Sequence, residues 1–127
     1  LAVNVKNKGI VIISGCGHQS IEKILLRTEM LFDEPIYAVL GGFHYPLEVE
    51  RNISWIQRYA VVGKLPWECL TVDEIRANCG LLKARKIKLV GLSAHDSSDG
   101  SIAIFKQEFP AEYVNIKVGE KISLGKN

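Results

Sequence analysis

The chain has 127 residues, of which 47% are hydrophobic and 24% charged, and its formal net charge is +2. This composition is typical of one globular domain with a single core. The balanced charge argues against a nucleic-acid or membrane-surface partner, and no signal peptide or membrane-spanning run is visible. The odd number of cysteines, three, favours free thiols in a reducing, cytoplasmic setting. Because the first residue is Leu1 rather than Met, we expect a longer parent protein.

The first third of the chain alternates short β-branched runs with one amphipathic stretch. Leu1–Lys6 alternates in polarity, and a turn at Asn7–Gly9 joins it to the run Gly9–Ser14, which predicts a β-hairpin. A helix is expected from about Gln19 to Phe32, because its apolar residues recur on one side. The run Pro35–Leu40 is then expected to form a buried strand.

The remainder of the chain contains an irregular region followed by clearer elements. Residues from about 51 to 70 are predicted to be an insertion, with a short helix at Asn52–Val62. Thr71 begins a helix with a capping box, in which Glu74 is the third residue after the cap. The last elements expected are a strand at Ile87–Gly91, a helix at Ser98–Phe109, and a closing hairpin made of Tyr113–Val118 and Gly119–Leu124.

All three histidines follow a predicted strand. His18 lies in the sequence GCGH, His44 in GGFH and His95 in LSAHD. Strand–loop–helix units build parallel sheets, in which the loops after the strands share one edge where ligands bind. Three imidazoles at one edge indicate a metal or a polyanionic substrate, the alternative being chance placement. Asp96 is expected to cap its own loop, and the alternative is a carboxylate that orients an imidazole.

The glycine-rich loop after Ser14 also allows other interpretations. Cys16 lies at the start of a predicted helix, where a thiolate is favoured, so it is either a metal ligand or a small structural residue. Cys69 and Cys79 are expected to be structural. The pair Gly15 and Gly17 could instead approach the phosphate of a nucleotide. That alternative is weakened because Ser20 replaces the third glycine and no acidic residue ends the next strand.

The strings GIVIISGCGHQSIEKIL and IYAVLGGFH resemble the metallo-β-lactamase fold, most closely the branch of dihydropterin-linked synthases of methanopterin biosynthesis. In that branch one strand ends in G-C-S-H and a later one in G-G-F-H-L; here Gly17 replaces the serine and Tyr45 the leucine. His95 fits the last histidine, although Asp96–Ser98 replaces the usual C-T-G. The H-x-H-x-D-H motif of the N-terminal half of the fold is absent. The resemblance therefore implies an α/β half-domain, residues 1–127, which is the C-terminal half of an αββα sandwich.

The resemblance also implies a function. It suggests a metal-dependent hydrolase, or hydrolase-related transferase, acting on a phosphorylated or pterin-like small molecule. Such a site needs the N-terminal half of the fold as a partner, in the same chain or a separate one. Divalent metal ions, with zinc expected, would be bound by His18, His95 and, less firmly, Cys16, while His44 and Tyr45 would bind the substrate. A non-catalytic half-domain for binding or assembly, including a homo-oligomer, is the competing class.

Overall fold

The computed structural model describes residues 1–47 and 70–124. The predicted insertion lies outside these residues except for Leu70, as does the predicted helix Asn52–Val62. None of the described helices is long and apolar enough to cross a membrane. The described elements, in chain order, are β1 (Ala2–Val5), β2 (Gly9–Ser14), α1 (Ile21–Leu31), β3 (Ile36–Gly41), α3 (Val72–Ala84), β4 (Leu89–Leu92) and α4 (Asp99–Glu108).

The strands form one four-stranded sheet in the order β1-β2-β3-β4. The first pair is antiparallel, and the predicted hairpin is confirmed, with Asn7 in the left-handed region at φ 63°. The pairs β2–β3 and β3–β4 are parallel, and each is joined by a connection that contains a helix. The mixed α/β class is therefore confirmed, and the carboxyl ends of β2, β3 and β4 lie at the same edge.

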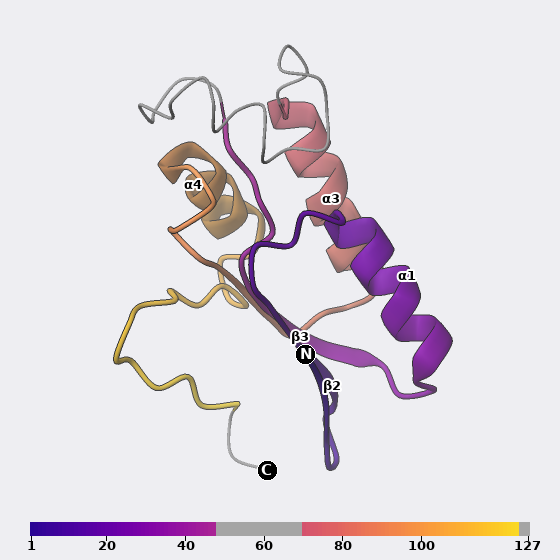
Figure 1. The fold of residues 1–127 in the computed structure, drawn as a ribbon. Coiled ribbons are helices and arrows are strands. Elements are labelled where there is room, and N and C mark those ends of the chain that lie inside the picture. The colour runs from indigo at the N-terminus through magenta and orange to yellow at the C-terminus, as the bar shows by residue number, and fades with distance from the viewer. Residues whose placement is uncertain (48–69, 125–127) are drawn as a thin grey trace.

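The three described helices cover one face of the sheet (Figure 1). Ile10, Ile12 and Val39 point from the strands into this layer, where they meet the buried residues of the helices. The helical side contributes Ile21, Leu25, Ile75, Cys79, Leu82, Phe105 and Phe109, all at most 3% exposed. The main hydrophobic core therefore lies between the sheet and the helices. Its packing fixes the position of each helix relative to the strand before it.

The opposite face of the sheet carries a second, smaller cluster, formed by Val11, Ala38 and Leu40. Part of the C-terminal segment, residues 113–124, packs over it through partly buried apolar side chains. In Figure 1 this segment, drawn in yellow, runs on the opposite side of the strands from α1 and α3. The Tyr37 hydroxyl donates a hydrogen bond to the carbonyl oxygen of Leu124 at 3.2 Å, which ties the segment to the sheet.

This second face is not fully covered by the described residues. Val3 pairs with Val11 and Leu1 with Ile13, so these four side chains point to the same side of the β1–β2 hairpin. Leu1 is 81%, Val3 40% and Ile13 45% exposed. An apolar patch therefore lies next to the second cluster.

The predicted closing hairpin is wrong. Tyr113 and Ile116 form only isolated parallel bridges, with Val90 and Ser93, and residues 119–124 form no strand. Ile122 and Leu124 pack against the second cluster, and Gly119 turns the chain at φ 83°. Side-chain burial on the sheet, rather than backbone pairing between the two segments, sets the course of this part of the chain.

The capping box at Thr71 is confirmed and generates a stability prediction. The Thr71 hydroxyl accepts from the Glu74 N–H at 3.2 Å, and the Glu74 carboxylate accepts from the Thr71 N–H at 2.9 Å. Thr71→Ala should therefore lower the free energy of unfolding by about 1 kcal/mol, measured by urea denaturation. Ser20→Ala is the matched control, because the N-cap Ser20 of α1 makes no side-chain capping bond. An equal loss in both variants would contradict the prediction.

Candidate functional site at the carboxyl edge of the sheet

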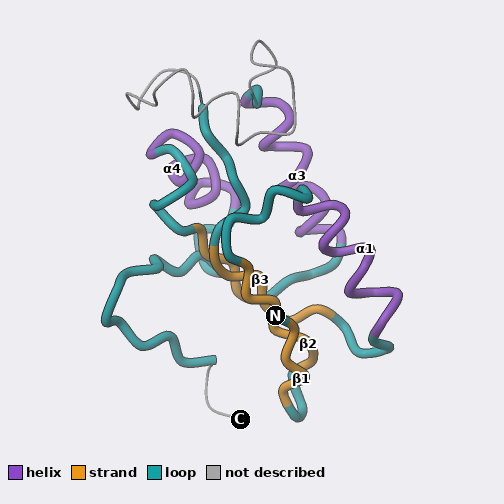
Figure 2. The backbone as a smooth tube through the Cα atoms, in the orientation of Figure 1, coloured by secondary structure: helices purple, strands orange, loops and turns teal. Residues whose placement is uncertain are grey.

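The loops that follow β2, β3 and β4 meet at one edge, and glycines permit the contact. A Cβ atom on Gly17 would lie 2.6 Å from the Gly42 carbonyl oxygen and 2.7 Å from Phe43 Cα. A Cβ on Gly42 would overlap the Gly15 carbonyl oxygen and the Asp96 carboxylate. Figure 2 shows the loops after β2 and β3 side by side before they diverge. Gly17 thus serves loop packing, which leaves its Cα face closed to a phosphate.

Two of the three histidines that were predicted to share this edge are in contact. The ring centroids of His18 and His44 lie 4.7 Å apart, with the ring planes inclined by 48°. His18 is exposed, whereas both ring nitrogens of His44 are buried without a hydrogen-bond partner. Burial and, secondly, the neighbouring His18 lower the pKa of His44. The neutral imidazole of His44 therefore offers a donor and an acceptor to a ligand at this position.

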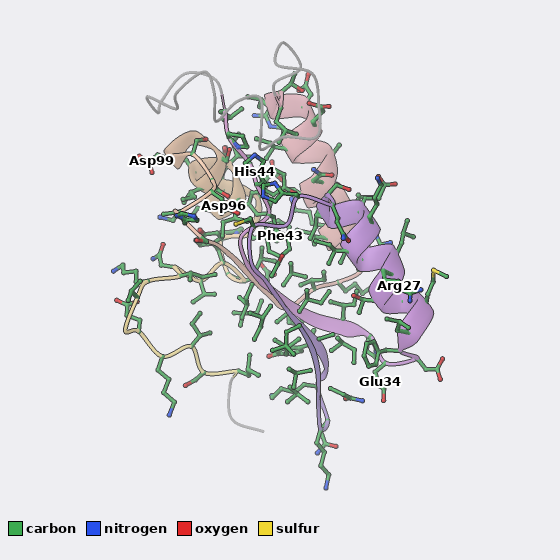
Figure 3. The ribbon with its side chains drawn as sticks, viewed as in Figure 1. Arg27, Glu34, Phe43, His44, Asp96 and Asp99 are labelled. Carbon is green, nitrogen blue, oxygen red and sulfur yellow. The ribbon has the colours of Figure 1, made fainter. Side chains whose placement is uncertain are left out.

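Asp96 joins the third loop to the second (Figure 3). Its Oδ2 accepts a hydrogen bond from the backbone N–H of His44 at 3.2 Å. This bond supports His44 in the left-handed region at φ 51°, a conformation that few non-glycine residues adopt. The carboxylate also bonds to the backbone of Asp96 itself, so the expected cap of its own loop is present, and the bond to the neighbouring loop adds to it. The cap of α4 is Ser98, whose side chain accepts from Ser101 N–H.

The second oxygen of Asp96 has no partner. Oδ1 is buried without a hydrogen bond, and burial raises the pKa of this carboxyl group. The imidazoles of His95 and His18 act in the opposite direction, which places both close to it. An unpartnered buried carboxylate oxygen within electrostatic reach of two histidines is a polar group that requires a counterpart. The sequence had suggested a carboxylate beside the imidazoles as the alternative for Asp96, from its position directly after His95.

A buried serine network, which was not foreseen, fixes the segment that carries His44. The Tyr45 carbonyl oxygen accepts from the Ser101 hydroxyl at 2.7 Å and from the Ser98 N–H at 3.0 Å. The Ser98 hydroxyl in turn accepts from the Leu47 N–H at 3.3 Å. The beginning of α4 is therefore bonded to the loop after β3. The sequence signal was a run of serines at the start of the predicted helix.

The other predicted site residues lie at the same edge with different exposure. Cys16 and His95 are exposed, and the His95 N–H donates to the Ser93 hydroxyl at 3.2 Å. Tyr45 is only 2% exposed, its ring packs against Phe105, and its buried hydroxyl lies by the Asn78 side chain without a well-formed hydrogen bond. Tyr45 therefore lies in the core and not on an open surface beside His44. The metal-binding roles of Cys16 and His95 and the substrate-binding role of Tyr45 remain predictions.

Of the two cysteines that were expected to be structural, only Cys79 lies among the described residues. Cys79 is buried on α3, as expected, and burial raises the pKa of its thiol to about 12. It therefore stays a protonated, structural thiol at neutral pH. Cys69 lies outside the described residues.

The edge fits part of a metal site. Among residues 1–47 and 70–124, no group of three or more His, Cys, Asp or Glu side chains is arranged to hold a metal ion. Asp96 nevertheless presents an unpartnered carboxylate oxygen near two imidazoles, and carboxylate and imidazole are the ligands that zinc takes in proteins. The described residues therefore offer side chains of the types that bind metal, without gathering three of them at one position.

With this geometry in place, the fold can be compared with known proteins. No family model matches the sequence. The structure resembles the crystal structure of Tm1679, a metal-dependent hydrolase of the beta-lactamase superfamily, with a TM-score of 0.70 and 26% identity. The match covers 96% of this chain and 38% of that one. The chain therefore has the mixed α/β fold of the metallo-β-lactamase superfamily, and its resemblance to that superfamily is confirmed.

The sequence is also similar to part of a second protein. Over 61 residues the chain is 34% identical to 7,8-dihydropterin-6-methyl-4-(beta-D-ribofuranosyl)-aminobenzene-5'-phosphate synthase of Methanocaldococcus jannaschii. That match covers 46% of this chain and 21% of the relative. The chain thus spans well under half the length of both proteins.

The glycine contacts predict a sharp contrast between two substitutions. Gly42→Ala should lower the free energy of unfolding by about 1–3 kcal/mol, because its Cβ meets backbone and a buried carboxylate that cannot move freely. Gly80→Ala, in the open on α3, should raise it by up to about 1 kcal/mol through helix propensity. Thermal and urea unfolding of both variants test this. A tolerated Gly42→Ala would mean that the loops do not pack as described.

Proposed function

We propose that the chain is part of a metal-dependent hydrolase, or hydrolase-related transferase, acting on a phosphorylated or pterin-like small molecule. The fold supports the superfamily, and the names of the two similar proteins suggest the reaction class and substrate. The observation that carries the proposal is the unpartnered Oδ1 of Asp96 beside His18 and His95, next to the unpartnered imidazole of His44. Buried polar atoms rarely lack partners unless a ligand supplies them.

As candidate metal ligands we propose His18, His95 and Asp96, with exposed Cys16 as a further thiolate donor; the described residues do not gather three of them around one position, so completing the site requires them to rearrange or to be joined by other ligands. Zinc is the metal we propose, because imidazole, carboxylate and thiolate are its protein ligands. When bound, such an ion lowers the pKa of a coordinated water to near ~7 and thereby supplies hydroxide at neutral pH. Free thiols at Cys16 and Cys79 are consistent with a reducing, cytoplasmic location, which is part of this proposal.

We assign the substrate to His44. Its neutral ring, kept so by burial, can donate one hydrogen bond and accept another, which suits an uncharged or phosphate oxygen of the substrate. Asp96 and the Ser98–Ser101 network hold its backbone, so the ring position is fixed before a ligand arrives. Its contact with the His18 ring places the bound group next to the metal-binding side chains.

We further propose that an N-terminal half of the same fold completes the site, in this protein or in a separate chain. The apolar patch of Leu1, Val3 and Ile13 lies on the sheet face away from the helices. In a sandwich that face packs against a second sheet, which would bring the missing ligands to the same edge. A stable half-domain that only binds or assembles is the competing outcome.

The three histidines should differ when metal content and kinetics are measured on the same preparations of the completed enzyme. His95→Ala should lose both metal and turnover, and His18→Ala should do so to a similar or lesser degree. His44→Ala should keep its metal, while KM rises about tenfold or more because a hydrogen-bonding partner of the substrate is lost.

Gln19→Ala is the control for the histidine series, because it alters an exposed neighbour of His18 without removing an imidazole. Elemental analysis gives the metal content. If His44→Ala lost its metal while His18→Ala retained it in full, the two assignments would be reversed. Complete retention of metal in all three variants would rule out the metal site at this edge.

The sheet face predicts where the completing half docks. Ile13→Lys should weaken association with that half at least tenfold, because a charge would be buried between two apolar sheets. Met30→Lys is the matched control, since Met30 is 76% exposed on α1, in the opposite layer. Sedimentation or calorimetric titration measures the affinity. Equal weakening by the two variants, or by neither, would place the interface elsewhere.

A further inference from the structure

A small pocket opens beside the histidine pair, on the helical side of the sheet. It has a volume of about 100 Å³ and lies between the start of α1, the segment Phe43–Tyr45 and α3. Ile21, Phe43 and Leu70 supply much of its apolar wall. His18 and His44 also line it, so a group seated there would adjoin the two imidazoles.

Two polar features distinguish this pocket from a packing defect. Tyr45 is only 2% exposed, and its hydroxyl makes no well-formed hydrogen bond; its side-chain neighbour is Asn78, which also lines the pocket. An unsatisfied buried hydroxyl costs about 1–3 kcal/mol unless something else bonds to it. The α1 N-terminus is the second feature, because Ser20 makes no side-chain capping bond there. Backbone N–H groups of the first helical turn therefore lack a side-chain acceptor.

The chemistry of the wall selects one kind of ligand group. No lysine or arginine is among the described residues that line the pocket, so this part of its wall offers no fixed positive charge to a phosphate. The volume is smaller than the roughly 150 Å³ of a cavity that holds benzene, so the edge of a ring fits better than a whole one. The polar atoms present are neutral donors and acceptors, which match a carbonyl or amide edge.

We infer that this pocket recognises the neutral, largely apolar end of the substrate through one carbonyl or amide edge that bonds to the Tyr45 hydroxyl and Asn78. The inference rests on the proposed function, because it takes the substrate of that same site. Two parts of the substrate are then bound at different places. The pocket binds the uncharged end, and any phosphate of the substrate lies outside it, towards the metal ligands.

The probe that tests the pocket is 2-pyridone, a neutral ring with an amide edge. The intact protein is labelled with ¹³C at the tyrosine ζ carbon, and the Tyr45 resonance is followed during titration. We expect 2-pyridone to shift this resonance to saturation and inorganic phosphate to leave it unchanged. Tyr45→Phe should weaken 2-pyridone binding by about fivefold, the effect of one neutral hydrogen bond. A phosphate-induced shift in place of the 2-pyridone shift would overturn the inference.

Tyr37→Phe is the matched control, because the Tyr37 hydroxyl already bonds to Leu124 on the other face of the sheet. It should lower the melting temperature and leave 2-pyridone binding unchanged. Tyr45→Phe should leave the melting temperature nearly unchanged, since its hydroxyl makes no well-formed hydrogen bond that could be lost. A clear drop would make that hydroxyl structural and overturn the inference. Asn78→Ala should weaken binding independently of Tyr45, and unchanged binding in both variants would also overturn it.

Metal-dependent turnover, measured separately, distinguishes the two proposals. If 2-pyridone binds as expected but the metal-loaded protein hydrolyses no phosphorylated or pterin-like substrate, the proposed function fails and the pocket stands. If turnover occurs but 2-pyridone leaves Tyr45 unchanged, the pocket inference fails alone.

Discussion

The site depends on the close approach of three loops that only glycine allows. Gly17 lies against Gly42 and Phe43, and Gly42 lies against Gly15 and the Asp96 carboxylate. Each loop follows a different parallel strand, so the sheet brings them to one edge and the absence of Cβ atoms lets them touch. The contact of the His18 and His44 rings and the bond from His44 N–H to Asp96 both follow from this approach.

A second constraint is that the site is built from buried groups that the described residues leave unsatisfied. The imidazole of His44 and Oδ1 of Asp96 lack partners, whereas Ser98 and Ser101 bond to each other and to the Tyr45 carbonyl oxygen. These serine bonds anchor α4 to the loop after β3, next to the unpartnered atoms. Rigid support next to unpaired polar groups is the arrangement expected of a binding site formed in advance.

The two faces of the sheet differ in how far the described residues cover them. The helical face buries the main core, so the fold has a hydrophobic layer of its own. The other face is covered only in part, by the C-terminal segment, and leaves Leu1, Val3 and Ile13 exposed. In the similar structure, more than half of the protein lies outside the matched region. Both facts agree with a metal site whose ligands come from two halves.

The sequence by itself determined the elements and the edge. Periodicity located β1–β4, α1, α3 and α4 within a few residues, because alternation and amphipathic stripes report which side chains are buried. The capping box at Thr71 and the turn at Asn7 were local and therefore readable. The glycine and histidine motifs placed His18, His44 and His95 after strands, and parallel topology then assigns them to one edge.

Only the tertiary structure decided which of these groups meet. Asp96 bonds to the neighbouring loop as well as to its own backbone, and Tyr45 turns into the core, because positions at the ends of loops depend on packing between distant segments. The closing hairpin failed for the same reason: an alternating pattern shows that one side of a segment is apolar, but not what covers it. Residues 119–124 bury that side against the sheet, and their backbone gains no strand partner.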